Sequence, residues 1–154
     1  MIKFNLNDGG RAASGYKGDV SDCVCRSIAI ATKQPYQKVY DELTKRNRSW
    51  RINSNSKHAY YAKPAKDTPR NSMPKIVAKE YLKDLGWTWI PTMFIGSGCK
   101  VHLRKDELPA GRLIVQVSRH LTAVIDGVLH DGYDCSREGT RCVYGYWKKL
   151  IRII

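Results

Sequence analysis

The stretch 120-HLTAVIDGVLHD-131 decides the fold of this chain of 154 residues. Apolar and β-branched residues flank Asp126-Gly127, a dipeptide that strongly favours a two-residue hairpin turn. A tight turn there sets Thr122 opposite Asp131 and makes His120 a diagonal neighbour of Asp131 on the same face. At that spacing a carboxylate can orient an imidazole, so the hairpin predicts a paired histidine and acid.

The alternation of the two strands divides their side chains between two faces of the predicted sheet. One face is apolar and also receives a histidine: Leu121, Ala123, Ile125, Val128 and His130. The other face holds His120, Thr122, Leu129, Asp131 and Tyr133. Since His130 points to the apolar face, it is expected to be structural. Asp134 is the nearest alternative to Asp131, but the same alternation turns it away from His120.

The rest of the chain predicts helices followed by a sheet. Apolar residues recur at helical spacing in 23–32, 36–46 and 74–85, whereas 1–20 is an extended lead-in punctuated by glycines. Further strands are expected at 87–90, 113–118 and 142–147, with 150–154 as a possible closing strand. This order indicates an α+β fold in which N-terminal helices pack on a C-terminal antiparallel sheet. The length fits a single domain over 1–154.

The middle of the chain is strongly basic. The net charge is +13 at pH 7, and Asp67 and Glu80 are the only acids between Lys45 and Lys83. We expect a long basic loop at 47–71 within an insertion at about 47–85. Basic and aromatic residues together suit nucleic acid or an acidic partner, and the residues predicted to bind are Arg48, Trp50, Arg51, Lys57, Tyr60, Tyr61 and Lys63. The alternative is a solvated face whose aromatic residues pack inward.

The cysteines are expected to be reduced. The N-terminus lacks the apolar segment of a signal peptide, and no apolar run is long enough to span a membrane, which indicates a cytoplasmic protein without a membrane partner. Cys23, Cys25, Cys99, Cys135 and Cys142 would then be free thiols. Their spacings do not match those of structural zinc sites, so we expect no metal and no cofactor. Cys135 and Cys142 flank a turn-like segment and could face each other in a hairpin.

Cys23 occupies the predicted N-terminus of the first helix, where Asp22 or Ser21 can provide a cap. Unpaired N–H groups and the helix dipole favour a thiolate there, and a histidine presented by a sheet can stabilise that thiolate and later protonate a leaving group. Cys25 lies about 200° around the helix from Cys23 and is expected to pack in the core.

Two segments carry a resemblance to a known family. DCVCRSIAIATKQPYQKVY at 22–40 and RHLTAVIDGVLHD at 119–131 resemble small papain-like proteins of bacteriophages and prophages, and are similar to the peptidase domains that trim bacteriocin leader peptides. The resemblance implies a thiol hydrolase that acts on a peptide, isopeptide or related acyl bond of a protein or peptide substrate. It places the nucleophile at Cys23, the base at His120 and the orienting acid at Asp131.

One departure from the family leaves a second hypothesis open. Papain-like enzymes usually carry a Gln before the Cys to complete the oxyanion hole, and no Gln precedes Cys23. Asn7, Ser21 or backbone N–H groups could substitute. Alternatively the scaffold has lost its activity and is a basic binding protein of phage origin. Such a protein would engage nucleic acid or a host nucleoprotein complex in the cytoplasm of the host cell, for example as a defence inhibitor.

Overall fold

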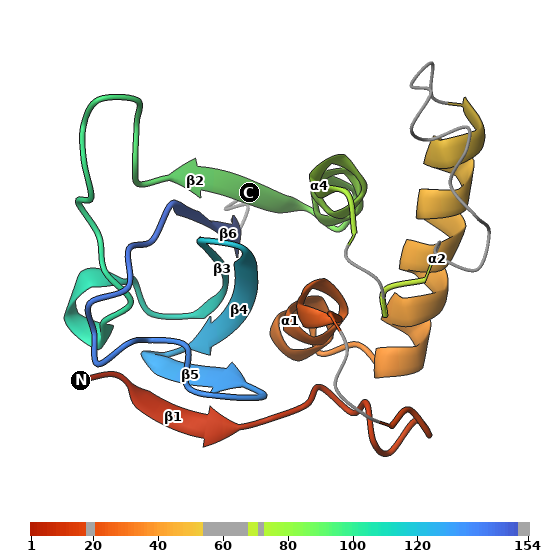
Figure 1. Cartoon of the computed structure of the whole chain (residues 1–154), viewed down its shortest axis with the longest axis horizontal. Helices are drawn as coiled ribbons and strands as arrows, with labels where there is room; N and C mark the ends of the chain where they lie inside the picture. Colours follow the sequence, from red (N-terminus) through yellow and green to blue (C-terminus); the bar gives the residue numbers. More distant parts are fainter. Residues whose placement is uncertain (18–20, 54–67, 71–72, 151–154) are drawn as a thin grey trace.

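The computed structural model describes residues 1–17, 21–53, 68–70 and 73–150 of the chain. It has an α+β fold in which the α-helices lie on one face of a six-stranded sheet (Figure 1). The helices of the described residues are α1 (Cys23–Thr32), α2 (Tyr36–Asn53), α4 (Lys75–Asp84) and the short 3-10 helix η2 (Lys105–Glu107). Helix α1 lies between the sheet and α2 and packs against both.

The sheet is mixed and not purely antiparallel. Its strand order is β1-β5-β4-β3-β6-β2, with β1 (Lys3–Leu6), β2 (Trp87–Pro91), β3 (Arg112–Val117), β4 (His120–Ile125), β5 (Val128–Asp131) and β6 (Gly145–Lys149). Strand β1 runs parallel to β5 at the sheet edge, and the other pairs are antiparallel. The expectation of an antiparallel sheet confined to the C-terminal part was therefore wrong at this edge. Its segment alternates apolar and polar residues, with Phe4 and Leu6 next to Lys3 and Asn5, but the strand is only four residues long and all four are exposed, so the pattern does not distinguish it from the extended lead-in that we expected.

The hairpin register predicted from Asp126-Gly127 is confirmed. Ala123 pairs with His130, and Ile125 with Val128. Asp126 has φ 48° and Gly127 has φ 75°, the two positive values that a type I′ turn requires. Because the side-chain period of a strand is two, this register fixes which residues share a face with His120.

Two apolar cores cover the two faces of the sheet. The core between the sheet and the helices includes Ile28, Val39, Leu82, Ile114, Leu121 and Ala123. The core on the opposite face includes Leu103, Leu113, Val115, Val124, Leu129 and Val143. Leu121 and Ala123 thus face the helices while Leu129 faces away from them, as the alternation predicted. The sheet is buried on both sides, which makes it a rigid support for side chains at its ends.

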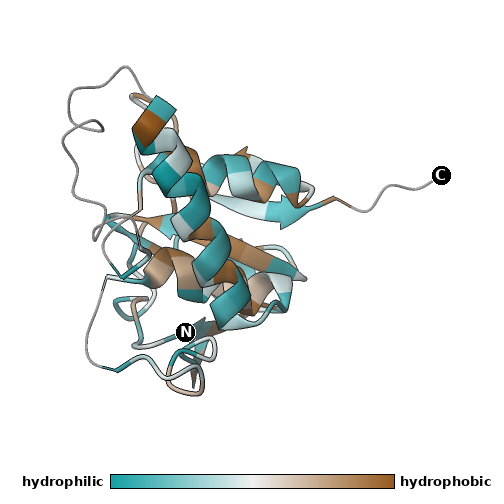
Figure 2. Cartoon of the chain, turned by 90° about the vertical axis from the view of Figure 1, so that its right-hand side faces the viewer, coloured by the Kyte–Doolittle hydropathy of each residue, from teal (hydrophilic) through white to brown (hydrophobic). Residues whose placement is uncertain are grey.

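Helix α2 is longer than its apolar pattern indicated. The helix was expected to end near residue 46 and to give way to a loop, but it continues to Asn53. Asn47 is buried at the position where an apolar residue would continue the stripe of Val39 and Leu43, and Trp50 packs against the same core one turn later. Figure 2 shows that the outward face of α2 is mostly hydrophilic. Residues 54–67 of the predicted loop lie outside the described residues.

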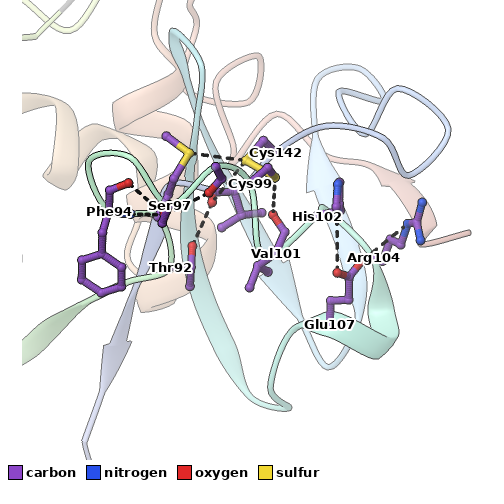
Figure 3. The surroundings of a disulfide bond; sticks show 12 residues. Thr92, Phe94, Ser97, Cys99, Val101, His102, Arg104, Glu107 and Cys142 are labelled. Carbon is purple, nitrogen blue, oxygen red and sulfur yellow. Dashed lines mark hydrogen bonds and ion pairs between the residues drawn. A yellow bond between two sulfur atoms is a disulfide. The ribbon is translucent and has the colours of Figure 1, made fainter.

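Cys99 and Cys142 form a disulfide (Figure 3). The expectation that all the cysteines are free thiols was therefore wrong for these two, and Cys142 does not face Cys135. The segment before β3 runs beside the segment before β6, with Val143 N donating to Val101 O at 2.8 Å and Leu103 N donating to Arg141 O at 2.9 Å. This pairing of two irregular segments has no periodic signal in the sequence. Cys23, Cys25 and Cys135 are free.

Among the described helices, none combines the length and the apolar character that crossing a membrane would require.

Candidate active site

Asp22 directly precedes α1 and is held in place by hydrogen bonds from other side chains. Asp22 is fully buried and occupies the N-cap position, but its carboxylate makes no cap hydrogen bond, contrary to expectation. It accepts hydrogen bonds from the Tyr36 hydroxyl at 2.7 Å, from Arg26 at 2.8 Å and from Arg11 at 3.3 Å. These contacts fix the first turn of α1 and leave its backbone N–H groups uncapped by the Asp22 carboxylate.

Cys23 and Cys25 have different surroundings although one residue separates them. Cys25 is fully buried and its thiol donates to the Tyr36 carbonyl at 3.8 Å. Burial and the nearby Asp22 carboxylate raise the pKa of Cys25. Cys23 is partly exposed. Burial opposes its thiolate, but hydrogen bonds from His120 and from the Leu121 N–H lower the pKa of Cys23 below its ordinary value. Cys23 is therefore the thiol suited to nucleophilic attack, and Cys25 is a packing residue, as expected.

His120 and Asp131 are in direct contact, as the hairpin predicted. Nε2 of His120 lies 2.6 Å from Oδ2 of Asp131, and both side chains are buried. Burial disfavours the imidazolium, but hydrogen bonding with Asp131, Cys135 and Cys23 raises the pKa of His120 well above its ordinary value of 6.5. Since Asp131 occupies Nε2, the other ring nitrogen, Nδ1, is the one available to Cys23. The arrangement favours a thiolate and imidazolium pair.

The Asp131 carboxylate is surrounded by donors. Thr122 Oγ1 donates to Oδ2 at 2.7 Å, and Gly132 N donates to Oδ1 at 2.6 Å. The Cys135 thiol lies 3.5 Å from Oδ2. Although burial opposes ionisation, the hydrogen bonds from His120, Thr122 and Gly132 lower the pKa of Asp131. The acid therefore remains ionised and orients the imidazole.

Three neighbours of this centre received no role from the sequence. Arg26 reaches Asp131 Oδ1 at 3.4 Å from the first turn of α1. Arg26 belongs to the segment 22–40 that resembles papain-like proteins, but the segment assigned this arginine no function. The hairpin register put Thr122 opposite Asp131 and so predicted that the two residues are close, although it gave the threonine no role. Cys135 follows β5 in an irregular segment, where no sequence period could locate it.

The alternative residues lie elsewhere. Asp134 accepts from Ser136 N at 3.0 Å and from Ser136 Oγ at 2.7 Å, which makes it a local turn residue. Nδ1 of His130 accepts from Asn5 at 3.0 Å and Asn7 at 3.3 Å, which supports the structural role expected of this histidine. Asn7 also accepts from Gly9 N at 2.9 Å, so both ends of its amide are engaged at β1. Asn7 is therefore not placed to complete an oxyanion hole.

His120, Asp131 and Cys135 also form a possible set of metal ligands. Their ligand atoms lie within 4.8 Å of one another, and nitrogen, oxygen and sulfur donors together suit zinc. In the arrangement observed, however, His120 and Asp131 are hydrogen bonded to each other directly. An ion would have to separate these two residues, so the geometry fits proton transfer better than metal binding.

The residues predicted to bind nucleic acid are placed only in part. Arg48 is exposed on α2 and Arg51 is partly buried near the end of the helix. Trp50 is partly buried and packs against the core between the helices and the sheet. This packing agrees with the alternative prediction, a solvated face whose aromatic residues pack inward. Lys57, Tyr60, Tyr61 and Lys63 lie outside the described residues.

Comparison of the chain with protein-family models, with curated proteins and with solved structures finds no match.

Proposed function

We propose that the protein is a thiol hydrolase of the papain-like type that cleaves a peptide, isopeptide or related acyl bond. The observation that carries the proposal is the 2.6 Å contact between His120 Nε2 and Asp131 Oδ2, which leaves the opposite ring nitrogen for Cys23. A thiol with a lowered pKa at a helix N-terminus, beside a histidine that is oriented by an acid, is the combination that covalent acyl transfer requires. The remaining residues of the centre maintain the ionised state of Asp131.

The proposed reaction has two steps. The Cys23 thiolate attacks the substrate carbonyl, and the His120 imidazolium donates its proton to the departing amine as the C–N bond breaks. A thioester forms on Cys23. Neutral His120 then takes a proton from water, hydroxide adds to the thioester carbonyl, and the C–S bond breaks to release the acid and restore the thiolate and imidazolium. Asp131 orients His120 throughout and is not itself protonated.

The developing oxyanion requires hydrogen-bond donors that are not provided by a Gln before Cys23. Backbone N–H groups at the start of α1 adjoin the nucleophile along the chain, and the Asp22 carboxylate does not occupy them. They are preorganised by the helix and lie at the positive end of its dipole. We assign the oxyanion hole to these groups, with Cys23 N–H as the first.

The experiment that tests this function compares the two neighbouring cysteines. Wild-type protein, Cys23→Ala and Cys25→Ala are treated briefly with iodoacetamide at about pH 6, where an ordinary thiol is almost fully protonated. Peptide mapping by mass spectrometry then locates the alkylated residue. Labelling is expected in wild type and Cys25→Ala and should be lost in Cys23→Ala. Equal labelling of the two variants would remove the case for Cys23 as the nucleophile.

A second candidate function is binding to nucleic acid or to an acidic nucleoprotein complex without catalysis. The observation that favours it is the set of exposed basic residues on α2, which includes Lys38, Lys45 and Arg48. Such a surface attracts polyanions through counterion release. This function is compatible with the first, since a basic hydrolase can meet its substrate on nucleic acid.

A further inference from the structure

A pocket of about 270 Å³ adjoins the candidate active site. It lies beside the start of α1 and is lined by residues of α4, β2, β3, β4 and the β6 region. Its volume is just below the range for small-molecule sites. The pocket therefore suits one bulky side chain of a longer substrate better than a whole cofactor.

The pocket begins at the immediate neighbours of the proposed catalytic residues. Val24, which follows Cys23 on α1, and Leu121, which follows His120 on β4, both line it. The backbone N–H of Leu121 also forms a hydrogen bond with the Cys23 sulfur. The pocket therefore lies within reach of a substrate residue next to the bond under attack.

The inner wall of the pocket is apolar and aromatic. Trp89 and Trp147 line it together, and their ring centroids lie 5.4 Å apart with planes inclined by 52°. Because the two rings contact each other, they form a wall and not a clamp into which a nucleobase could slide. Gly145 permits this arrangement, since a Cβ at that position would overlap the Trp89 ring. The wall therefore suits an apolar side chain.

The outer part of the pocket is cationic. Lys75 and Lys79 line it from α4, and both are exposed. Their spacing of four residues puts them one above the other on the same side of the helix. Lys83 continues the row by another turn, but it does not line the pocket. Two cations beside an apolar pocket would attract a carboxylate next to the apolar residue of a substrate.

We propose that this pocket selects the substrate, and that the substrate is an acidic peptide with a bulky apolar side chain next to the scissile bond. The apolar side chain enters the pocket against Trp89 and Trp147, and a neighbouring Asp or Glu pairs with Lys75 and Lys79. This inference rests on the proposed hydrolase function, because it assigns the pocket to the substrate of Cys23. It adds the class of substrate and the residues that determine specificity.

The test measures how fast matched peptidyl acyloxymethyl ketones alkylate Cys23. The probes differ in two positions only: Phe or Gly beside the reactive group, and Glu or Lys next to it. We expect Phe to react at least about tenfold faster than Gly, the discrimination typical of an apolar pocket. Glu should react about fivefold faster than Lys, which is the range of exposed ion pairs, and added salt should reduce this preference. Equal rates for all four probes would overturn the inference.

Surface variants on α4 keep the charge part of the test independent of folding. The double change Lys75→Glu and Lys79→Glu should reverse the preference from Glu to Lys probes, whereas Lys83→Glu on the same helix should preserve it. Ala78→Trp, which fills the pocket from α4, should remove the preference for Phe over Gly. An unchanged Glu preference in the double variant, or a single-stranded oligonucleotide that blocks alkylation better than an acidic peptide, would count against the inference.

Iodoacetamide distinguishes failure of this inference from failure of the hydrolase proposal. This reagent has no side chain to place in the pocket, so its reaction with Cys23 depends on the thiolate alone. Normal iodoacetamide labelling together with equal rates for the four peptides overturns the specificity pocket and leaves the hydrolase standing. Loss of selective iodoacetamide labelling at Cys23 overturns the hydrolase and the pocket's role with it.

Discussion

Arg26 on α1 lies 3.4 Å from Asp131 at the end of β5, through its Nη2 and the carboxylate Oδ1. The same guanidinium lies 2.8 Å from Asp22 Oδ1. Both acids are almost fully buried, and Arg26 itself is 9% exposed. One arginine thus joins the helix that begins with Cys23 to the hairpin that presents His120, and its charge compensates two buried carboxylates.

We predict that Arg26→Met destabilises the fold by about 3–5 kcal/mol, because it removes the cation that two buried carboxylates share. Urea denaturation measures this loss. Arg46→Met is the matched control: Arg46 pairs with Glu42 and Asp84 at 2.7 Å each, but these groups are partly exposed, so the expected cost is about 0–1 kcal/mol. A further change, Asp22→Asn, should recover part of the stability of Arg26→Met. Equal losses for Arg26→Met and Arg46→Met would contradict the bridging role.

Asp131→Asn is expected to weaken the thiolate of Cys23 without removing it. The variant cannot stabilise the His120 imidazolium by charge, so the pKa of His120 falls and that of Cys23 rises toward its ordinary value. Each unit of rise lowers iodoacetamide labelling at about pH 6 roughly tenfold. Asp134→Asn is the control, because Asp134 contacts Ser136 in a turn, and it should label like wild type. Similar rates for Asp131→Asn and wild type would sink the assignment of Asp131.

The disulfide is expected to stabilise the fold without affecting the thiol site. It joins residues 43 positions apart, which suggests a contribution of about 2–4 kcal/mol from a constrained unfolded chain. Cys99→Ser should lower the thermal midpoint and abolish its sensitivity to reductant, while Cys23 keeps its labelling rate. Thermal unfolding with and without dithiothreitol measures the first effect. A midpoint of wild type that does not respond to reductant would show that the bond makes no such contribution.

The binding function predicts affinity for polyanions that depends on salt. Binding of a single-stranded oligonucleotide should weaken steeply as salt rises from about 50 to about 200 mM. Lys45→Glu and Arg48→Glu on α2 should weaken it further, whereas Cys23→Ala should bind normally. Fluorescence anisotropy provides the measurement, and Lys3→Glu on the edge strand β1 is a control for net charge. Affinity that is insensitive to salt would exclude this function for the α2 surface.

The candidate site could be predicted largely because its acid and histidine lie in one hairpin. Asp126-Gly127 fixed a register, and the register alone brought His120, Thr122 and Asp131 to one face. The residues around Cys23 also predicted that it lies at the start of a helix. What joins these two parts is a tertiary contact between α1 and β4. No local pattern encodes that contact, and it was anticipated only through the resemblance to papain-like proteins.

The features that the sequence did not predict have physical causes that a local pattern does not reveal. Strand β1 is an exposed edge of four residues, too short for its alternation to distinguish a strand from an extended segment, and its partner β5 lies more than a hundred residues later in the chain. The end of α2 was missed because buried Asn47 interrupts an otherwise apolar stripe. Cys99 and Cys142 meet between irregular segments. The pocket formed by Trp89, Trp147 and α4 likewise depends on packing between distant elements and on the absence of a side chain at Gly145.

The central claim is that Cys23 is a thiolate paired with His120, and the pH profile of its alkylation tests this most directly. The rate of iodoacetamide reaction at Cys23 is followed by mass spectrometry from about pH 4 to about pH 10 in the Cys25→Ala background. Because the pKa of Cys23 is lowered from 9.0, the midpoint of the rate profile should lie below that pH. His120→Ala should shift the profile upward toward 9.0. A wild-type profile that rises only around 9.0, or that His120→Ala leaves unchanged, would contradict the claim.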